Sequence, residues 1–196
     1  DIPSLLGVNG LALQAERVEQ VSIDGALTVR SLWGVGKMNV GSARDTKPVP
    51  VVEMTRTVFP SRSLPLMCER YVLRNVGEKP LAVYIPEFSQ VVTTDPAKGV
   101  TGSYVVRGDL AGSGTFTLAP ADSLAFDAVF QAYRSGEEPL RPDVAAEYAA
   151  RMEFVHGCID ANLVLETPDP VIDTEFRYAK LRAAESIVKT RGGYMH

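Results

Sequence analysis

The chain of 196 residues has room for one large domain, or for one domain with an appendage, and for a sizeable buried core. Its 45% hydrophobic and 22% charged residues match ordinary globular proteins and exclude a disordered or collagen-like chain. The net charge of −4 and the lack of a Lys/Arg block argue against nucleic-acid binding, and no apolar run reaches the roughly 20 residues of a membrane span.

Up to about residue 140 the sequence consists of short runs with β-type alternation, separated by turn residues. The predicted strands cover residues 18–23, 26–33, 51–59, 66–76, 81–85, 89–94, 102–107, 114–118 and 123–132. Between the first two lies Asp24-Gly25, which predicts a two-residue type I′ turn. No helix separates the strands, and parallel strands would need helical crossovers. The sequence therefore predicts a mainly β protein, with an antiparallel β-sandwich over residues 1–140.

The aromatic residues of the predicted strands include candidates for sugar binding, because aromatic rings pack against the apolar faces of sugars. The candidates are Trp33, Tyr84, Phe88, Tyr104 and Tyr133. Trp33 leads into residues 34–50, a Gly- and Pro-rich stretch that predicts a long loop, and loops of that length are often functional or mobile. Packing in the core of the sandwich is the alternative role for each ring. Trp33, Tyr84 and Tyr104 are the predicted carbohydrate-binding residues.

Beyond Gly136 the apolar period changes to that of helices. Pro142 and Asp143 suit the start of a first helix, whose apolar face runs to Ile159. The run Thr167-Pro168-Asp169-Pro170 opens a second helix, which is predicted to end at Gly192-Gly193. Its apolar stripe consists of Ile172, Phe176, Ala179, Ala183 and Ile187. Two C-terminal helices are thus expected in residues 141–196, and an exposed stripe would offer a contact for another chain or for a homo-oligomer.

The residues that carry catalysis or bind metals in other proteins form no recognisable constellation. Cys68 and Cys158 are predicted in different elements, which favours free thiols over a disulfide. His156 and His196 have no cluster of ligands around them, so no metal, cofactor or catalytic residue is predicted. The strand carboxylates, namely Glu53, Glu69, Glu87 and Asp95, are expected to face solvent or to form turns.

The string LVLETPDPVIDTEFRYAKLRAAESIVKTRGGYMH, residues 163–196, resembles the junction between an N-terminal β-sandwich and the first helices of an (α/α)6 barrel in six-hairpin glycosidases. That group includes α-L-rhamnosidase-like and glycogen-debranching-like enzymes. Three earlier strings resemble the supersandwich-like domain of the same group, namely VEQVSIDGALTVRS, RTVFPSRSLPLMCERYVLRNVGEKPL and AFDAVFQAYRSGEEPL. The similarity extends through most of the chain, as a pattern of strands and turns.

The resemblance implies a non-catalytic N-terminal domain of a glycoside hydrolase acting on oligo- or polysaccharides. Such a domain would support the barrel and the cleft rim, with residues 141–196 as the linker and first helix of a truncated barrel. Hydrolysis needs two carboxyl groups about 5 to 9.5 Å apart, which the family places in the barrel, so the chain is expected to be inactive without that missing catalytic domain. A stand-alone carbohydrate-binding module and a structural or assembly module remain the alternatives. The start at Asp1 fits a trimmed mature product as well as an engineered start, and the expected location is periplasmic or extracellular.

Overall fold

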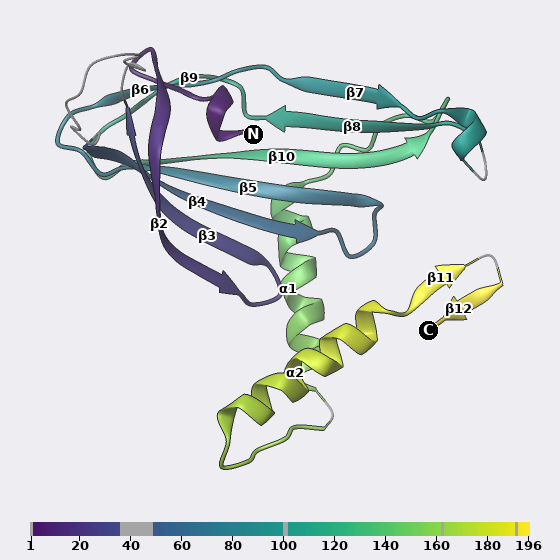
Figure 1. Ribbon diagram of the computed structural model, residues 1–196. Helices are drawn as coiled ribbons and strands as arrows, with labels where there is room; N and C mark the ends of the chain where they lie inside the picture. Colours follow the sequence, from purple (N-terminus) through teal and green to yellow (C-terminus); the bar gives the residue numbers. More distant parts are fainter. Residues whose placement is uncertain (1, 36–48, 100–101, 162, 191) are drawn as a thin grey trace.

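The structure is a computed structural model that describes residues 2–35, 49–99, 102–161, 163–190 and 192–196. The protein is mainly β: a curled antiparallel sheet is followed by two helices, as predicted (Figure 1). Most of the loop predicted at 34–50 lies outside the described residues. Among the described residues, no helix combines the length and the apolar character needed to cross a bilayer.

The strands lie side by side in an order that differs from their order in the sequence, and every ladder is antiparallel. Across the sheet they are β7 (Ser89–Thr93), β8 (Tyr104–Ala111), β10 (Ser123–Arg134), β5 (Leu66–Asn75), β4 (Pro50–Pro60), β3 (Leu27–Val35), β2 (Leu11–Ile23), β1 (Gly7–Val8), β6 (Leu81–Ile85) and β9 (Gly114–Leu118). Two short 3-10 turns, η1 (Pro3–Leu5) and η2 (Pro96–Lys98), flank this sheet. The sheet curls so that β1, β6 and β9 lie over its larger part, which makes two layers (Figure 1).

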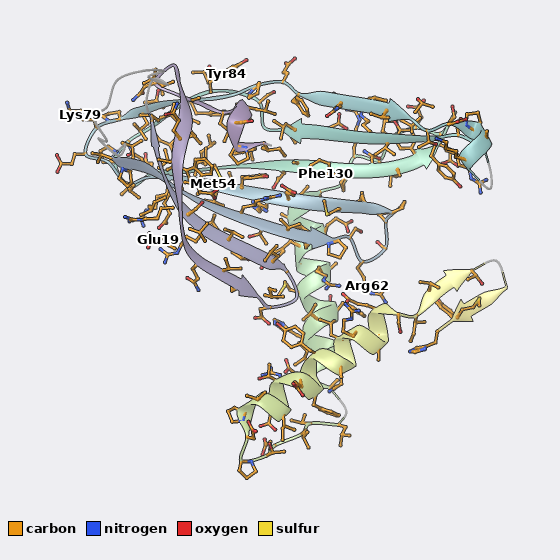
Figure 2. The ribbon with its side chains drawn as sticks, viewed as in Figure 1. Glu19, Met54, Arg62, Lys79, Tyr84 and Phe130 are labelled. Atoms are coloured by element: carbon orange, nitrogen blue, oxygen red, sulfur yellow. The ribbon has the colours of Figure 1, made fainter. Side chains whose placement is uncertain are left out.

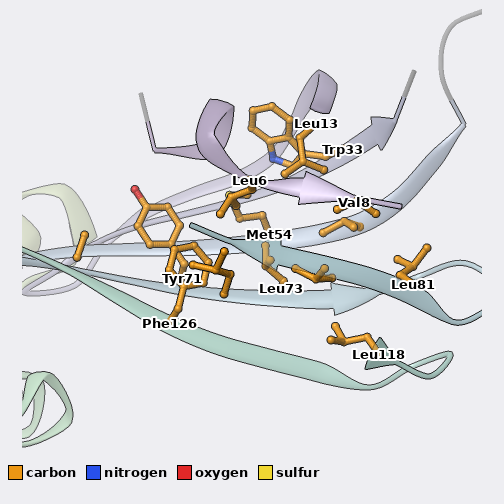
Figure 3. Close-up of a cluster of buried hydrophobic side chains, with 14 residues drawn as sticks. Leu6, Val8, Leu13, Trp33, Met54, Tyr71, Leu73, Leu81, Leu118 and Phe126 are labelled. Atoms are coloured by element: carbon orange, nitrogen blue, oxygen red, sulfur yellow. The ribbon is translucent and has the colours of Figure 1, made fainter. Parts of the chain in front are cut away.

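The main hydrophobic core lies between these two layers, on what we call the inner face of the sheet (Figure 3). Strand β6 shows how the sequence builds it: Leu81, Val83 and Ile85 are buried, whereas the alternate side chains are exposed. They meet side chains of β4 and β5 such as Met54 and Leu73, which are buried as well. Strict alternation therefore assigns β6 one buried face, and the curl of the sheet supplies the surface that covers it.

Helix α1 (Val144–Asp160) covers the opposite, outer face of the sheet (Figure 1). A second cluster of buried side chains fills this contact, consisting of Ala26, Phe59, Leu66, Cys68, Val129 and Val144. The Phe59 and Tyr148 rings meet edge to face with their centroids 5.2 Å apart. Because β4, β5 and β10 are covered on both faces at this point, each also buries an apolar side chain on its outer face, namely Phe59, Cys68 and Val129.

The β2–β3 connection corrects the prediction of a two-residue type I′ turn. Ile23 pairs with Leu27, so three residues form the loop, and of Asp24 and Gly25 only Gly25 has positive φ, at +74°. The backbone N–H of Asp24 donates to the Ala26 carbonyl at 3.1 Å. Ala26 leaves the ladder because its side chain is buried in the contact with α1. A tertiary contact thus lengthened a loop for which local turn chemistry favoured two residues.

The end of the second helix also differs from the prediction. Helix α2 (Pro170–Glu185) starts at its predicted proline but stops at Glu185, where the Ser186 N–H still donates to the Arg182 carbonyl. The chain then forms a hairpin of β11 (Val188–Thr190) and β12 (Gly193–Met195), in which Thr190 pairs with Gly193. The β-branched residues after α2 prefer strands, and Gly193, with φ of +119°, serves the hairpin rather than a helix cap.

Candidate functional site

The three predicted carbohydrate-binding residues are not brought together. Trp33 is only 8% exposed, lies in the core between the layers, and donates its indole N–H to Ser31 Oγ at 2.8 Å (Figure 3). Tyr84 projects from the outer surface of β6 and is half exposed (Figure 2). Tyr104 is partly buried at the start of β8, opposite Arg134 and at the other end of the molecule from β6 (Figure 1). The Trp33 ring has the packing role named as the alternative, and these three residues form no shared aromatic platform.

A polar cluster on the inner face is formed by the buried Glu69 and Tyr71 of β5 with Arg56 of β4, whose side chain is 41% exposed. Arg56 donates two hydrogen bonds to the Glu69 carboxylate, from Nε to Oε2 at 3.0 Å and from Nη2 to Oε1 at 2.6 Å. The Tyr71 hydroxyl donates to the same carboxylate. Glu69 is 4% exposed, which corrects the expectation that it faces solvent. A carboxylate can be buried here because three donors replace its water.

Two groups of the cluster, Arg56 and Tyr71, have raised pKa values. The hydrogen bond to Glu69 raises the pKa of Arg56 against the opposing effect of burial. Burial, and after it the bond to Glu69, raises the pKa of Tyr71 well above its ordinary range. Strongly perturbed groups often mark functional sites, but a tyrosine that stays protonated and an arginine that stays charged are fixed donors, not proton-transfer groups. The arrangement can orient a hydroxyl or hold strands together; it cannot serve as an acid–base pair.

A cavity of about 210 Å³ lies beside this cluster. Its walls include Phe88 and Phe130, with Gln90 as a further polar side chain; Phe130 is labelled in the middle of β10 in Figure 2. Aromatic walls with a few polar groups suit sugars, but the volume is below the roughly 300 Å³ at which ligand pockets usually begin. Tyr71 also stacks on Phe126 with their centroids 4.8 Å apart, so its ring faces are used in packing. We therefore assign the cluster a structural role.

The helical segment is firmly attached to the outer face through α1. Arg151 of α1 is 7% exposed, and its Nε donates to the Gly25 carbonyl at the tip of the β2–β3 loop at 2.8 Å. The Ser61 hydroxyl, which follows β4, donates to Glu147 Oε2 at 2.5 Å. Arg151 Nη2 also lies 2.5 Å from Glu185 Oε1, which links the end of α2 to α1. These contacts give α1 a defined position on the sheet.

Helix α2 is held to the end of α1 mainly by polar contacts. The Lys180 ammonium donates to the carbonyls of Ile159, Ala161 and Leu163, each at 2.8 Å. These carbonyls lie at and after the C-terminus of α1, where backbone acceptors lack intrahelical partners and a cation is favourable. The Tyr178 hydroxyl donates to the Ile23 carbonyl at 2.7 Å. Three donors on one ammonium thus fix the segment between the two helices.

The apolar side chains around the start of α2 are largely uncovered. Only Leu181 is buried in α2, and Ile172 of the predicted stripe is 48% exposed. We define the helical docking surface by its exposed side chains, Leu163, Val164, Leu165, Val171 and Ile172. A groove of about 430 Å³ is lined by the first three of these residues and by Phe176 of α2. Figure 1 shows α2 crossing the lower end of α1 with its start directed away from the sheet, so the sandwich does not cover this surface.

The two cysteines are free, as expected, and Cys68 lies in a strand and Cys158 in a helix. Burial, together with the charges of Glu147 and Asp127, raises the pKa of the Cys68 thiol to about 11. A thiol with so high a pKa is a poor nucleophile at neutral pH. Within the described ranges, no group of three or more His, Cys, Asp or Glu residues is arranged to hold a metal ion.

Comparison with known proteins adds no identification: no family model, no curated protein and no solved structure matches the chain. Function must therefore be argued from the surfaces themselves. The Arg56–Glu69–Tyr71 cluster was not predicted from the sequence, although a signal was present. Strand β5 reads LMCERYVLRN, and Glu69 alternates with Tyr71 and Leu73 on one face, so a glutamate at this position required a buried partner.

Proposed function

We propose that the chain is a non-catalytic β-sandwich domain that supports a helical catalytic domain of a glycoside hydrolase. The observation that carries the proposal is the helical docking surface, whose apolar side chains are uncovered although the helix beneath them is firmly attached. Val171 is 61% exposed and Leu163 is 69% exposed. Contiguous apolar surface on a folded domain marks a contact with another protein surface.

Two features favour another folded domain as the occupant. The Lys180 ammonium orders the segment before α2, so the surface is preformed and little ordering entropy is lost on docking. Among the strands that the structure describes, β11 and β12 pair only with each other, and the Tyr194 and Met195 side chains are 76% and 60% exposed. An isolated two-stranded hairpin is marginally stable in water, so a covering surface would stabilise it.

The carbohydrate part of the proposal rests on the resemblance of residues 163–196 to the sandwich–barrel junction of six-hairpin glycosidases. The helical docking surface belongs to that same segment. In this arrangement the barrel helices cover Val171 and Ile172 and provide the opposed carboxyl groups of the hydrolase. The sandwich then acts as a support, and its inner-face cluster maintains the sheet rather than the chemistry.

The test compares the 196-residue chain with the polypeptide that the whole gene encodes, by amide hydrogen exchange. If the proposal is right, the whole polypeptide contains a helical domain, hydrolyses aryl glycosides, and protects the amides of residues 163–178. The 196-residue chain alone should leave these amides exchanging faster and should not hydrolyse aryl glycosides.

The matched variants are Val171→Asp and Val92→Asp. Both valines are more than half exposed, at 61% and 54%, but only Val171 belongs to the helical docking surface. Asp at 171 lies in the first turn of α2, where the helix dipole favours an acidic residue, so the helix itself should persist. Val171→Asp should remove the protection of residues 163–178 in the whole polypeptide, and Val92→Asp should leave it. Equal exchange in the chain and the whole polypeptide, or turnover by the chain alone, refutes the proposal.

A further inference from the structure

A second cavity, of about 350 Å³, lies on the outer face between the sheet and the segment that leads into α1. Its walls are contributed by three parts of the chain: Arg107 and Asp109 from β8, Val129 and Gln131 from β10, and Leu140 and Arg141 from the connection. Its volume falls in the lower part of the range for small-molecule sites and matches a ligand of monosaccharide size. Pro139 and Pro142 complete its apolar lining.

The rim of this cavity is held in place from both sides. The Gln131 side chain, 5% exposed, donates from Nε2 to the Leu140 carbonyl at 3.0 Å and accepts the Leu140 N–H on Oε1 at 2.7 Å. Three residues further on, Asp143 Oδ1 caps α1 by accepting the N–H groups of Ala145 and Ala146. The backbone of Arg141 lies between these two attachments, so its side chain is presented at the cavity from a defined position.

The charges in the cavity do not cancel. Arg107 Nε donates to both carboxylate oxygens of Asp109, at 2.9 and 2.6 Å, which neutralises that pair. Burial alone would raise the pKa of Asp109, but hydrogen bonds from Arg107 and Ser89 and the charge of Arg141 outweigh it and lower the pKa, so the carboxylate stays ionised. Among the described residues, no carboxylate lies within ion-pair distance of Arg141. The positive charge of Arg141 is therefore not compensated by an ion pair.

We propose that this cavity binds a small monocarboxylate of sugar-acid size, with its carboxylate on Arg141 and its ring against Val129 and Leu140. A guanidinium binds a planar carboxylate through two parallel hydrogen bonds. The ionised Asp109 disfavours a dianion such as phosphate, because only one positive charge is uncompensated. The apolar walls favour a ligand with a carbon skeleton over a free inorganic anion. This site is independent of the helical docking surface and of the proposed function.

The test is calorimetric titration of the chain with glucuronate, glucose and inorganic phosphate. The informative variant is Arg141→Gln, and the control is Arg74→Gln, which removes another exposed arginine that does not line the cavity. Neither change removes a buried group, and circular dichroism checks that both variants fold. Glucuronate should bind to the wild type and to Arg74→Gln with the same Kd, and Arg141→Gln should weaken it by roughly tenfold or more. Glucose and phosphate should bind at least tenfold more weakly than glucuronate.

Each contrary result overturns a stated part of the site. If glucose binds with the same Kd as glucuronate, the ligand carboxylate does not contribute to binding. If phosphate binds as tightly as glucuronate, the site does not prefer a monoanion. An unchanged Kd in Arg141→Gln removes Arg141 from the site. No heat with glucuronate at millimolar concentrations overturns the proposal as a whole.

Discussion

Replacing Gly25 by Ala tests how tightly the helical segment is packed against the sandwich. Gly25 has φ of +74°, and a Cβ built there would lie 2.6 and 2.8 Å from the two methyl carbons of Val155, which is fully buried in α1. Left-handed backbone costs a non-glycine residue about 1–2 kcal/mol. Overpacking a well-filled contact costs roughly another 1–3 kcal/mol. The sum predicts that Gly25→Ala lowers the free energy of unfolding by about 2–5 kcal/mol.

Gly10 provides the matched control. Its φ is +72°, almost that of Gly25, but a Cβ built there meets nothing within 4 Å. Gly10→Ala should therefore show the backbone cost alone, about 1–2 kcal/mol. The difference between the two variants measures the steric contact of the β2–β3 loop with α1.

Urea unfolding followed by tryptophan fluorescence is the assay, because Trp33 is the single Trp and is buried in the core. In a Val155→Ala background the steric part should shrink, so the cost of Gly25→Ala should approach that of Gly10→Ala. Equal costs for Gly25→Ala and Gly10→Ala in the wild-type background would refute the reasoning. They would mean that α1 moves aside freely and that the helical segment is only loosely attached.

Three further predictions concern buried groups. Burial raises the pKa of Asp127; the charge of Arg70 opposes this effect and that of Asp143 reinforces it. The protonated carboxyl therefore stabilises the fold below the unfolded-state pKa, and this stabilisation is lost as the pH rises through the folded-state pKa. Asp127→Asn should therefore raise the urea midpoint at neutral pH and lose this advantage in acid; a lower midpoint at neutral pH would contradict this. Tyr71→Phe leaves the buried Glu69 without one donor and should cost about 1–3 kcal/mol of unfolding free energy, whereas exposed Tyr84→Phe should change it by less than about 0.5 kcal/mol. In Cys158→Ser, a thiol reagent should label the remaining Cys68 at neutral pH far more slowly than it labels the urea-unfolded chain, because burial raises the pKa of Cys68 to about 11; equal rates would show that the thiol is accessible.

Short-range sequence patterns predicted the positions of most helices and strands. The bounds of β6 and β9 were predicted without error, because each is a short alternating run between turn residues and one of its faces is covered. The starts of both helices were also close, since Asp143 and Asp169 cap them through short-range hydrogen bonds. The end of α2 was placed too late, because an apolar period continues into the hairpin and periodicity alone does not separate the two.

The candidate surfaces were harder to predict than the elements. The exposed apolar residues of α2 were anticipated in part, because the helical period identified the stripe to which Ile172 belongs, and Ile172 is 48% exposed whereas Phe176 of the same stripe is partly buried. The outer-face cavity was not anticipated. Arg107 and Arg141 are 34 positions apart in the chain (141 − 107) and belong to unrelated local patterns, so only the path of residues 135–143 across the sheet brings them to one cavity.

The sequence by itself determined the fold class, the antiparallel pairing and the presence of two C-terminal helices, because alternation, turn residues and caps act over a few neighbouring positions. Only the tertiary structure decided which face of each strand is buried and by what. Trp33 was buried in the core and Glu69 was paired with Arg56 because the sheet curls over itself and α1 covers its other face. That curl depends on the register and packing of strands far apart in the chain, and burial is a property of the whole assembled surface rather than of any local run.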